Sequence, residues 1–277
     1  MTEITQELIR SWIPKREKTA HKGDFGRVHI LAGSMGFTGA PYFASEAAVR
    51  TGSGLVYLSV PSEIWPVLAV KCNEAMPSPI FDVTQLLSKM NACDAVLIGP
   101  GLGRSWSTDA QTLRFTRELL PPLILDADGI NAVCGHIDVL KARKDRLTVL
   151  TPHEGEFSRL LGGSEHWSDR AAAAEAFAAD SGCVVVLKGH RTVTAFPDGS
   201  LFVNTTGNPG MAKGGSGDIL AGMILSLLGQ GIRAHQAIPA AVWLHGKAGD
   251  LCAEELGEYG MTPTDVLQKI PKAFNLN

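Results

Sequence analysis

The chain has 277 residues, of which 45% are apolar and 19% are charged, and its formal net charge is −3. This length and apolar content are enough for a large core, in one domain or in two small ones. Acidic and basic residues are mixed along the whole length without a basic stripe, which argues against nucleic acid as a partner.

Short β-branched runs alternate with helical patterns through the first two-thirds of the chain. Strands are expected over residues 27–33, 54–60, 94–101, 122–128, 146–153 and 183–189, and Ala-rich helices over about 41–50 and 170–180. Residues 192–204 predict a hairpin at the sheet edge, with Asp198-Gly199 at its turn. From Asp218 onward the chain is expected to be mainly helical, with amphipathic helices over 237–256.

Near-continuous apolar strands that alternate with helices indicate an α/β fold with a mostly parallel sheet covered on both faces. We find no linker and no internal repeat, and therefore expect a single domain over 1–277. Glycine or polar residues follow the strand ends, in the segments AGSMGFTGA, GPGLGRS, DADGIN, TPHEGEF and KGHRT. Ligands of open sheets bind outside the carboxyl ends of the strands, so these exits predict a small-molecule cleft.

The segment GGSGD (214–218) directly precedes a strongly apolar helical pattern. The first amides of a helix have no internal partner and favour anions, and glycine lets a phosphate approach them closely. Asp218 would then be a general base for an alcohol that attacks a phosphoryl group. Ordinary capping explains the segment equally well, with Ser216 as the N-cap. A P-loop does not fit, because Ala212 precedes Lys213 where that motif requires glycine.

Five segments together resemble one family. GPGLGRS (99–105), DADGIN (126–131), TPHEGEFSRLLG (151–162), VVVLKGHRTV (184–193) and GNPGMAKGGSGDILAG (207–222) occur in this order. They are similar to segments of the ADP/ATP-dependent NAD(P)H-hydrate dehydratases, and the similarity extends over roughly residues 10–275. The resemblance implies a three-layer ribokinase-like domain without the epimerase domain that is often fused to it.

The resemblance also implies repair of damaged nicotinamide cofactors. Such enzymes use ADP or ATP to phosphorylate the S epimer of hydrated NADH or NADPH, and release NAD(P)H, phosphate and AMP or ADP. The alternative is a ribokinase-like kinase of a vitamin-precursor alcohol. Sister kinases often have T-P-N-x-x-E where this chain has Thr151-Pro152-His153-Glu154-Gly155-Glu156, and the histidine favours the dehydratase.

Family roles carry over to matching positions. Asp218 would be the base, and the amides around it would stabilise the transferring phosphoryl group. The implied catalytic residues are Asp218, Gly215, Ser216 and Gly217. The implied nucleotide-binding residues are Lys188, Gly189, His190, Arg191, Thr192, Asn208 and Gly217. The implied substrate-binding residues are Ala40, Gly103, His153 and Asp218.

Several roles stay open at this point. Glu156 is a candidate magnesium ligand or a helix stabiliser, and Mg²⁺ is expected to bridge the nucleotide phosphates. Asp126 and Asp128 either orient Asn131 or water around that metal or cap the next helix. Lys213 stands where many relatives have threonine or serine, and either contacts phosphate or points to solvent.

Location and partners follow from the N-terminus, the cysteines and the family. The start MTEITQELIR lacks a secretory apolar run, and no segment reaches the roughly 20 apolar residues of a membrane span. The five cysteines are dispersed singly, which is typical of reduced core thiols in a cytoplasmic protein. The resemblance implies a homo-oligomer that works with a separate NAD(P)H-hydrate epimerase.

Overall fold

The computed structural model describes residues 1–163 and 169–276 and contains one ten-stranded sheet. Its spatial order is β1-β10-β9-β8-β7-β6-β5-β2-β3-β4. Neighbouring strands are parallel except that β9 runs antiparallel to β8 and β10. The strands are β1 (Thr2–Glu3), β2 (Arg27–Leu31), β3 (Leu55–Val60), β4 (Met76–Pro79), β5 (Ala95–Ile98), β6 (Leu123–Leu125), β7 (Thr148–Leu150), β8 (Val184–Leu187), β9 (Val193–Ala195) and β10 (Leu201–Val203).

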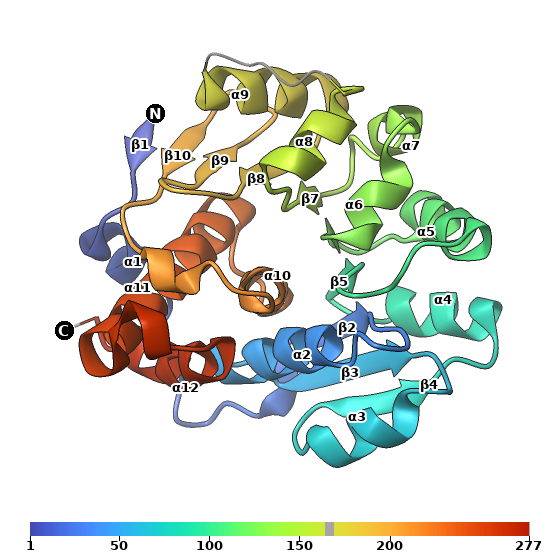
Figure 1. Cartoon of the computed structure of the whole chain (residues 1–277), viewed down its shortest axis with the longest axis horizontal. Coiled ribbons are helices and arrows are strands. Elements are labelled where there is room, and N and C mark those ends of the chain that lie inside the picture. The colour runs from blue at the N-terminus through green and yellow to red at the C-terminus, as the bar shows by residue number, and fades with distance from the viewer. Residues whose placement is uncertain (164–168, 277) are drawn as a thin grey trace.

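Helices cover both faces of the sheet. Because side chains alternate along a strand, Ala95 and Leu97 of β5 join one buried cluster, and Val96 and Ile98 join the other. Figure 1 shows the sheet curving around α10, with α2, α11 and α12 on the same side as α10, and α4 to α9 along the outer side. The α-helices are α1 (Gln6–Trp12), α2 (Gly39–Thr51), α3 (Trp65–Lys71), α4 (Val83–Asn91), α5 (Trp106–Glu118), α6 (Asp128–Val133), α7 (Ile137–Lys141), α8 (Glu154–Leu160), α9 (Arg170–Ser181), α10 (Ser216–Gly229), α11 (Ala234–Gly260) and α12 (Pro263–Ala273). Two 3₁₀ turns are η1 (Lys22–Phe25) and η2 (Pro209–Met211).

The predicted α/β class with a mostly parallel, doubly covered sheet is confirmed. Each of the six expected parallel strands is present, but most end two or three residues early, because the chain leaves the sheet before the glycine or polar exit. The hairpin at 192–204 is present as β9 and β10, but it does not form the edge, since β1 pairs with β10 and covers it. Among the described helices, none is long and apolar enough to cross a membrane.

A glycine brings α10 into backbone contact with α2. Gly222 is buried in the middle of α10, and a methyl group there would overlap the carbonyl oxygen of Ala44 and lie 3.0 Å from Cβ of Ala47. The two helices therefore pack closer than side chains would allow. This contact fixes the position of α10, whose N-terminus carries GGSGD, relative to the start of α2.

We expect Gly222→Ala to lower the free energy of unfolding by about 1–3 kcal/mol, the range for overpacked cores. Alanine favours the helix by up to about 1 kcal/mol, but the overlap with Ala44 involves backbone that cannot rotate away. Urea unfolding at constant pH measures the change. Gly260→Ala is the matched control, because a methyl there meets no atom within 4 Å. Equal stability of the two variants would contradict the close contact.

Candidate active site

Two loops of the expected cleft follow β2 and β5, at the topological switch point where neighbouring strands connect to helices on opposite faces of the sheet. β2 and β5 are parallel neighbours, yet β2 leads into α2 on the inner face and β5 into α5 on the outer face. Ligands bind in the crevice that such divergent loops leave open. Ala40 lies in the first turn of α2, and a methyl group on Gly101 would lie 2.9 Å from its Cβ. The loops after the two strands are therefore in contact, and Gly101, with φ +58°, permits it.

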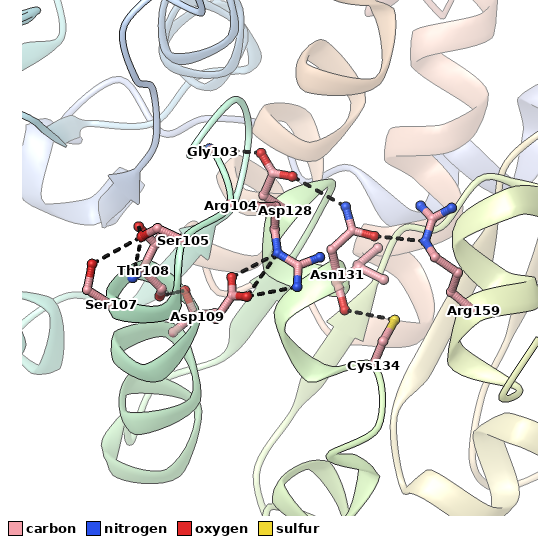
Figure 2. Close-up of polar contacts among 12 residues, drawn as sticks. Gly103, Arg104, Ser105, Ser107, Thr108, Asp109, Asp128, Asn131, Cys134 and Arg159 are labelled. Carbon is pink, nitrogen blue, oxygen red and sulfur yellow. Dashed lines mark hydrogen bonds and ion pairs between the residues drawn. The ribbon is translucent and has the colours of Figure 1, made fainter.

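The loop that carries Gly103 is anchored by Asp128 (Figure 2). The amide of Gly103 donates to Oδ2 of Asp128 at 2.9 Å, and Oδ1 accepts from Nδ2 of Asn131 at 3.3 Å. Nε of Arg159 in turn donates to Oδ1 of Asn131 at 3.0 Å. Asp128 thus orients Asn131 and also holds the predicted substrate loop in place, while the expected role of these residues around a metal stays a prediction.

Asp126 and Asp128 face different partners. Ala127 between them has φ +48°, an uncommon left-handed value for a residue with a side chain. Asp126 is 1% exposed and contacts Lys188 and Thr151, which lie on the far side of β6 from Gly103. The two carboxyls therefore belong to separate parts of the site.

The N-terminus of α10 begins at a glycine and not at a serine cap. Gly215 is the N-cap with φ +107°, and no described side chain caps the helix there. Any Cβ at Gly215 would lie 2.8 Å from the ring of Phe43, so glycine is required both for its φ and for space. The interpretation of Ser216 as N-cap is wrong, because Ser216 is already the first helical residue. The amides of Gly217 and Asp218 have no protein acceptor within the described residues, and the helix dipole favours an anion there.

A largely buried ammonium faces this helix end, since the side chain of Lys188 is only 19% exposed. Nζ of Lys188 lies 2.9 Å from Oδ1 of Asp126 and 3.9 Å from Oε2 of Glu156, and a methyl on Gly217 would lie 3.4 Å from it. Thr151 donates to the same oxygen of Asp126 at 2.7 Å. Burial alone would lower the pKa of Lys188, but Asp126 and Glu156 outweigh it and place that pKa above its ordinary value. Lys188 therefore stays charged beside the uncapped amides.

Asp218 has the protonation behaviour of a general base. Burial, and next the nearby Asp126, raise the pKa of Asp218 to about 7, while Lys188 acts in the opposite direction. A base is most effective when its pKa lies near the working pH. The carboxyl sits in the first turn of α10, beside the amides that would hold a phosphoryl group.

His245 of α11 is a site neighbour that the sequence did not reveal. Its side chain is buried, and Nε2 lies 3.5 Å from Oγ of Ser216. Burial, and then the charge of Lys188, lower the pKa of His245 to about 4, so the imidazole is neutral at pH 7. The sequence signal is a lone histidine in an apolar helical pattern, which is not diagnostic of function.

His153 and Glu156 form a reciprocal cap at the start of α8. Nδ1 of His153 accepts from the amides of Gly155 and Glu156 at 3.0 and 3.3 Å. Oε2 of Glu156 accepts from the amide of His153 at 2.8 Å. This is a capping box, in which a histidine takes the place of the usual serine or asparagine. Glu156 therefore does stabilise the helix, and its metal role stays a prediction.

The segment 188–192 forms a tight turn after β8. Gly189 has φ +145° and Arg191 has φ +54°, and Oγ1 of Thr192 donates to the carbonyl of Gly189 at 2.9 Å. Arg191 lies 3.8 Å from Glu3 of β1. The turn is thus bonded within itself, and it places Lys188 at the carboxyl edge of the sheet.

Two other predicted residues are engaged by the protein itself. Oδ1 of Asn208 accepts from the amide of Gly210, and its Nδ2 donates to Asp250 at 3.0 Å. Lys213 is exposed, and its ammonium donates to the carbonyls of Tyr259 and Met261, away from the anion site. Both side chains hold the η2–α10 segment against α11.

A cavity of about 760 Å³ lies away from these residues, at the C-terminal end of α10. Arg16 and Phe25 line it, together with Gly52, Leu227 and Gln230. None of the predicted site residues lines this cavity. The candidate active site is at the opposite end of α10, where charged side chains and amides without a protein acceptor lie together within the described residues.

Comparison with known proteins identifies the family. The model of the NAD(P)H-hydrate dehydratase family matches residues 28–272. The chain belongs to this family. A bifunctional NAD(P)H-hydrate repair enzyme of Moorella thermoacetica is 40% identical over 97% of this chain and 53% of its own length. An ADP-dependent (S)-NAD(P)H-hydrate dehydratase of Listeria monocytogenes is 36% identical over 98% of this chain and 95% of its own length.

Solved structures agree with the family and its fold. The ADP/ATP-dependent NAD(P)H-hydrate dehydratase of Bacillus subtilis, co-crystallised with ATP and Mg²⁺, has a TM-score of 0.83 and 32% identity, covering 98% of this chain and 96% of its own. Ribokinase of Thermotoga maritima, 13% identical with a TM-score of 0.54 over 89% of this chain and 99% of its own, shares the fold alone. The ribokinase-like fold is thereby confirmed. The chain spans about half the length of the first curated relatives it matches.

In this chain, the residues predicted for the reaction lie together. Gly215, Ser216, Gly217, Asp218 and Lys188 meet at the N-terminus of α10. Glu156 and His153 extend the group along α8, while Ala40 and Gly103 lie on the loops at the switch point. The individual roles assigned to these residues stay predictions.

We expect Asp218→Asn to be more stable than the native chain at pH 8. A carboxyl whose pKa is about 7 in the folded state and lower in the unfolded state binds its proton more tightly when folded, so its deprotonation destabilises the fold. The free energy of unfolding of the native chain should fall as the pH rises from about 4 to 7. At pH 8 the free energy of unfolding of the variant should exceed that of the native chain by a few kcal/mol, since one pKa unit equals about 1.4 kcal/mol. Urea unfolding from pH 5 to 8 measures it, with exposed Asp145→Asn as control. A constant difference between variant and native chain over this range would contradict the raised pKa.

Proposed function

We propose that this chain catalyses the ADP- or ATP-dependent dehydration of the S epimer of hydrated NADH or NADPH, releasing NAD(P)H, phosphate and AMP or ADP. The observation that supports it most is Asp218, a half-buried carboxyl with a pKa near 7 beside uncapped helix amides and the Lys188 ammonium. The Listeria monocytogenes relative has this activity in its name, and the Bacillus subtilis structure was obtained with ATP and Mg²⁺.

The first step is a phosphoryl transfer. Asp218 accepts the proton of the ring hydroxyl, the hydroxyl oxygen attacks the terminal phosphorus, and the bond to AMP or ADP breaks. Negative charge on the transferring group is stabilised by the amides of Gly217 and Asp218, the helix dipole and Lys188.

The second step is an elimination. The carbon–oxygen bond breaks with its electron pair on the leaving phosphate, a proton is lost from the adjacent ring carbon, and the ring double bond is restored. Phosphate leaves far more readily than hydroxide, which explains why a nucleotide is consumed in a reaction whose net result is loss of water.

The nucleotide and the substrate approach from different sides. Residues 188–192, Asn208 and Gly217 would bind the nucleotide, and Ala40, Gly103 and His153 the hydrated cofactor. The loops after β2 and β5 leave the sheet on opposite faces, which leaves room for a bulky dinucleotide between them. His153 follows β7, which lies between β8 and β5 in the sheet. Its exposed side chain is therefore placed between Lys188, which follows β8, and this crevice.

The donors present fit a magnesium ion that arrives with the nucleotide. Within the described residues no group of three or more His, Cys, Asp or Glu is arranged to hold a metal by itself. Mg²⁺ commonly uses one or two carboxylates together with substrate phosphates and water, and Glu156 and Asp126 are the carboxylates nearest Lys188. When bound, the ion would neutralise charge on the phosphate oxygens.

We further propose a cytoplasmic homo-oligomer that acts in partnership with an NAD(P)H-hydrate epimerase. The five cysteines are free, which suits a reducing compartment. An epimerase would convert the R epimer to the S epimer that this site uses.

Asp218→Asn should lower kcat by at least about a hundredfold, the usual range for a general base, while nucleotide binding persists. The assay incubates hydrated NADH with ADP or ATP and follows the absorbance of the restored reduced ring, and calorimetry measures nucleotide binding. Retained turnover in the variant would contradict the assignment of the base. Formation of a stable phosphorylated alcohol by the native enzyme, without restored NADH, would instead indicate a small-molecule kinase.

For the native enzyme, kcat/KM should rise with pH up to about 7 and then level off, because Asp218 must be unprotonated to act as a base. A terminal phosphate also titrates near pH 6, so the profile alone does not assign the group. Lys188→Met settles the assignment: Lys188 lowers the pKa of Asp218, and its removal should move the inflection to higher pH. An inflection unmoved by this substitution would assign the titration to another group.

A further inference from the structure

Arg170, the first residue of α9, forms hydrogen bonds to the backbone of the turn that follows β8. Its Nη1 donates to the carbonyl of His190 at 2.9 Å, and its Nη2 donates to the carbonyls of Lys188 at 2.9 Å and Leu187 at 3.4 Å. A methyl on Gly189 would lie 2.7 Å from Nη2, so glycine is needed for the guanidinium to lie against the turn. One side chain thus bonds three of four consecutive carbonyls.

These hydrogen bonds determine which way the amides of the turn face. In a trans peptide the N–H points opposite to the C=O of the same peptide plane, and all described peptides are trans. Because the carbonyls of Lys188 and His190 face Arg170, the amides of Gly189 and Arg191 face away from it. Neither amide has a protein acceptor in the described part of the chain, whereas the amide of Lys188 donates to Pro152 at 2.8 Å.

The guanidinium also connects the turn to α8. Nε of Arg170 lies 3.1 Å from Oε1 of Glu154, which directly follows His153. The planar fork of arginine can meet several carbonyls and a carboxylate at once, a geometry that lysine cannot reproduce. The Arg170 side chain is only 28% exposed, so its position is well defined by its neighbours.

We infer that Arg170 is a positioning residue for the nucleotide: it fixes the peptide planes of residues 187–191 so that the free amides of Gly189 and Arg191 face the phosphate-bearing ligand. The Nη atoms of Arg170 donate to the carbonyls of the turn itself, so Arg170 acts through the turn. The inference rests on the proposed function, because it takes the turn 188–192 as the nucleotide-binding segment. Its ligand class is a nucleoside di- or triphosphate, whose anionic oxygens accept from backbone amides.

The test compares Arg170→Ala and Arg170→Lys with the native enzyme. Arg170→Ala should raise the KM and the calorimetric Kd for ADP (or for ATP, if that is the nucleotide turned over) about tenfold to a hundredfold, a range typical of small misplacements of binding groups. KM for the hydrated cofactor should change less than about twofold, because Arg170 bonds none of the residues proposed for that site, Ala40, Gly103 and His153. Arg170→Lys keeps the charge without the fork and should fall between the two.

Arg114→Ala is the matched control, because Arg114 pairs with Glu118 on α5 and touches no part of the turn. It should leave both KM values unchanged. An unchanged KM for the nucleotide in folded Arg170→Ala would overturn the inference, as would an equal rise in both KM values with a lowered Tm, which is the result of a merely structural role. If Arg170→Ala does not fold, Arg170→Lys decides in the same way.

Failure of the proposed function gives a different result. If the native enzyme neither binds ADP or ATP nor restores NADH, the proposed function itself is wrong, whatever Arg170 does. If the native enzyme is active, the Arg170 variants test the positioning role alone.

Discussion

The site depends on one largely buried ammonium group. Nζ of Lys188 is the cation that faces Asp126, Glu156 and Asp218, and a buried carboxylate without a partner is strongly unfavourable. The raised pKa of Asp218 reflects first its burial and then the charge of Asp126, an ionisation cost that Lys188 offsets only in part. A proton on Asp218 relieves it before the substrate reacts. The same carboxyl therefore becomes a base of nearly neutral pKa because of where it is buried and which charges surround it.

The glycines around α10 serve this electrostatic arrangement. Gly222 lets α10 touch the backbone of α2, and Gly215 lets the helix begin against the ring of Phe43. Together they place the uncapped amides of α10 near the start of α2, where Ala40 lies. A side-chain cap at this helix would have bonded the amides that an anion needs. The missing cap and the close packing are thus two aspects of one requirement, a helix end that is open to an anion but fixed in position.

From the sequence, the architecture could be predicted better than the side-chain contacts could. Apolar runs between glycine exits located the parallel strands, because a doubly covered sheet needs apolar residues on both faces of each strand. β1 and β4 were missed: one has two residues, and the other reads Met-Pro-Ser-Pro, which is tolerated at an edge but carries no strand signal. The glycine-rich motifs marked the site, but the pairing of Lys188 with Asp126 joins residues 62 positions apart, and no local pattern contains it. His245 and Arg170 were invisible for the same reason, and the single-domain organisation stays a prediction.

His153 shows why a residue type can change at a fixed position without losing the local structure. An asparagine at this position would cap α8 with its side-chain oxygen, and Nδ1 of His153 accepts from the same kind of amides. Because Nδ1 accepts, it carries no proton in this arrangement, and the ring keeps Nε2 free of the cap, 3.5 Å from Oε1 of Glu156. The ring is also larger than an amide, and its side chain is 56% exposed. Histidine therefore preserves the helix start that positions Glu156 near Lys188, while adding an imidazole at the edge where the substrate loops and the charged cluster meet.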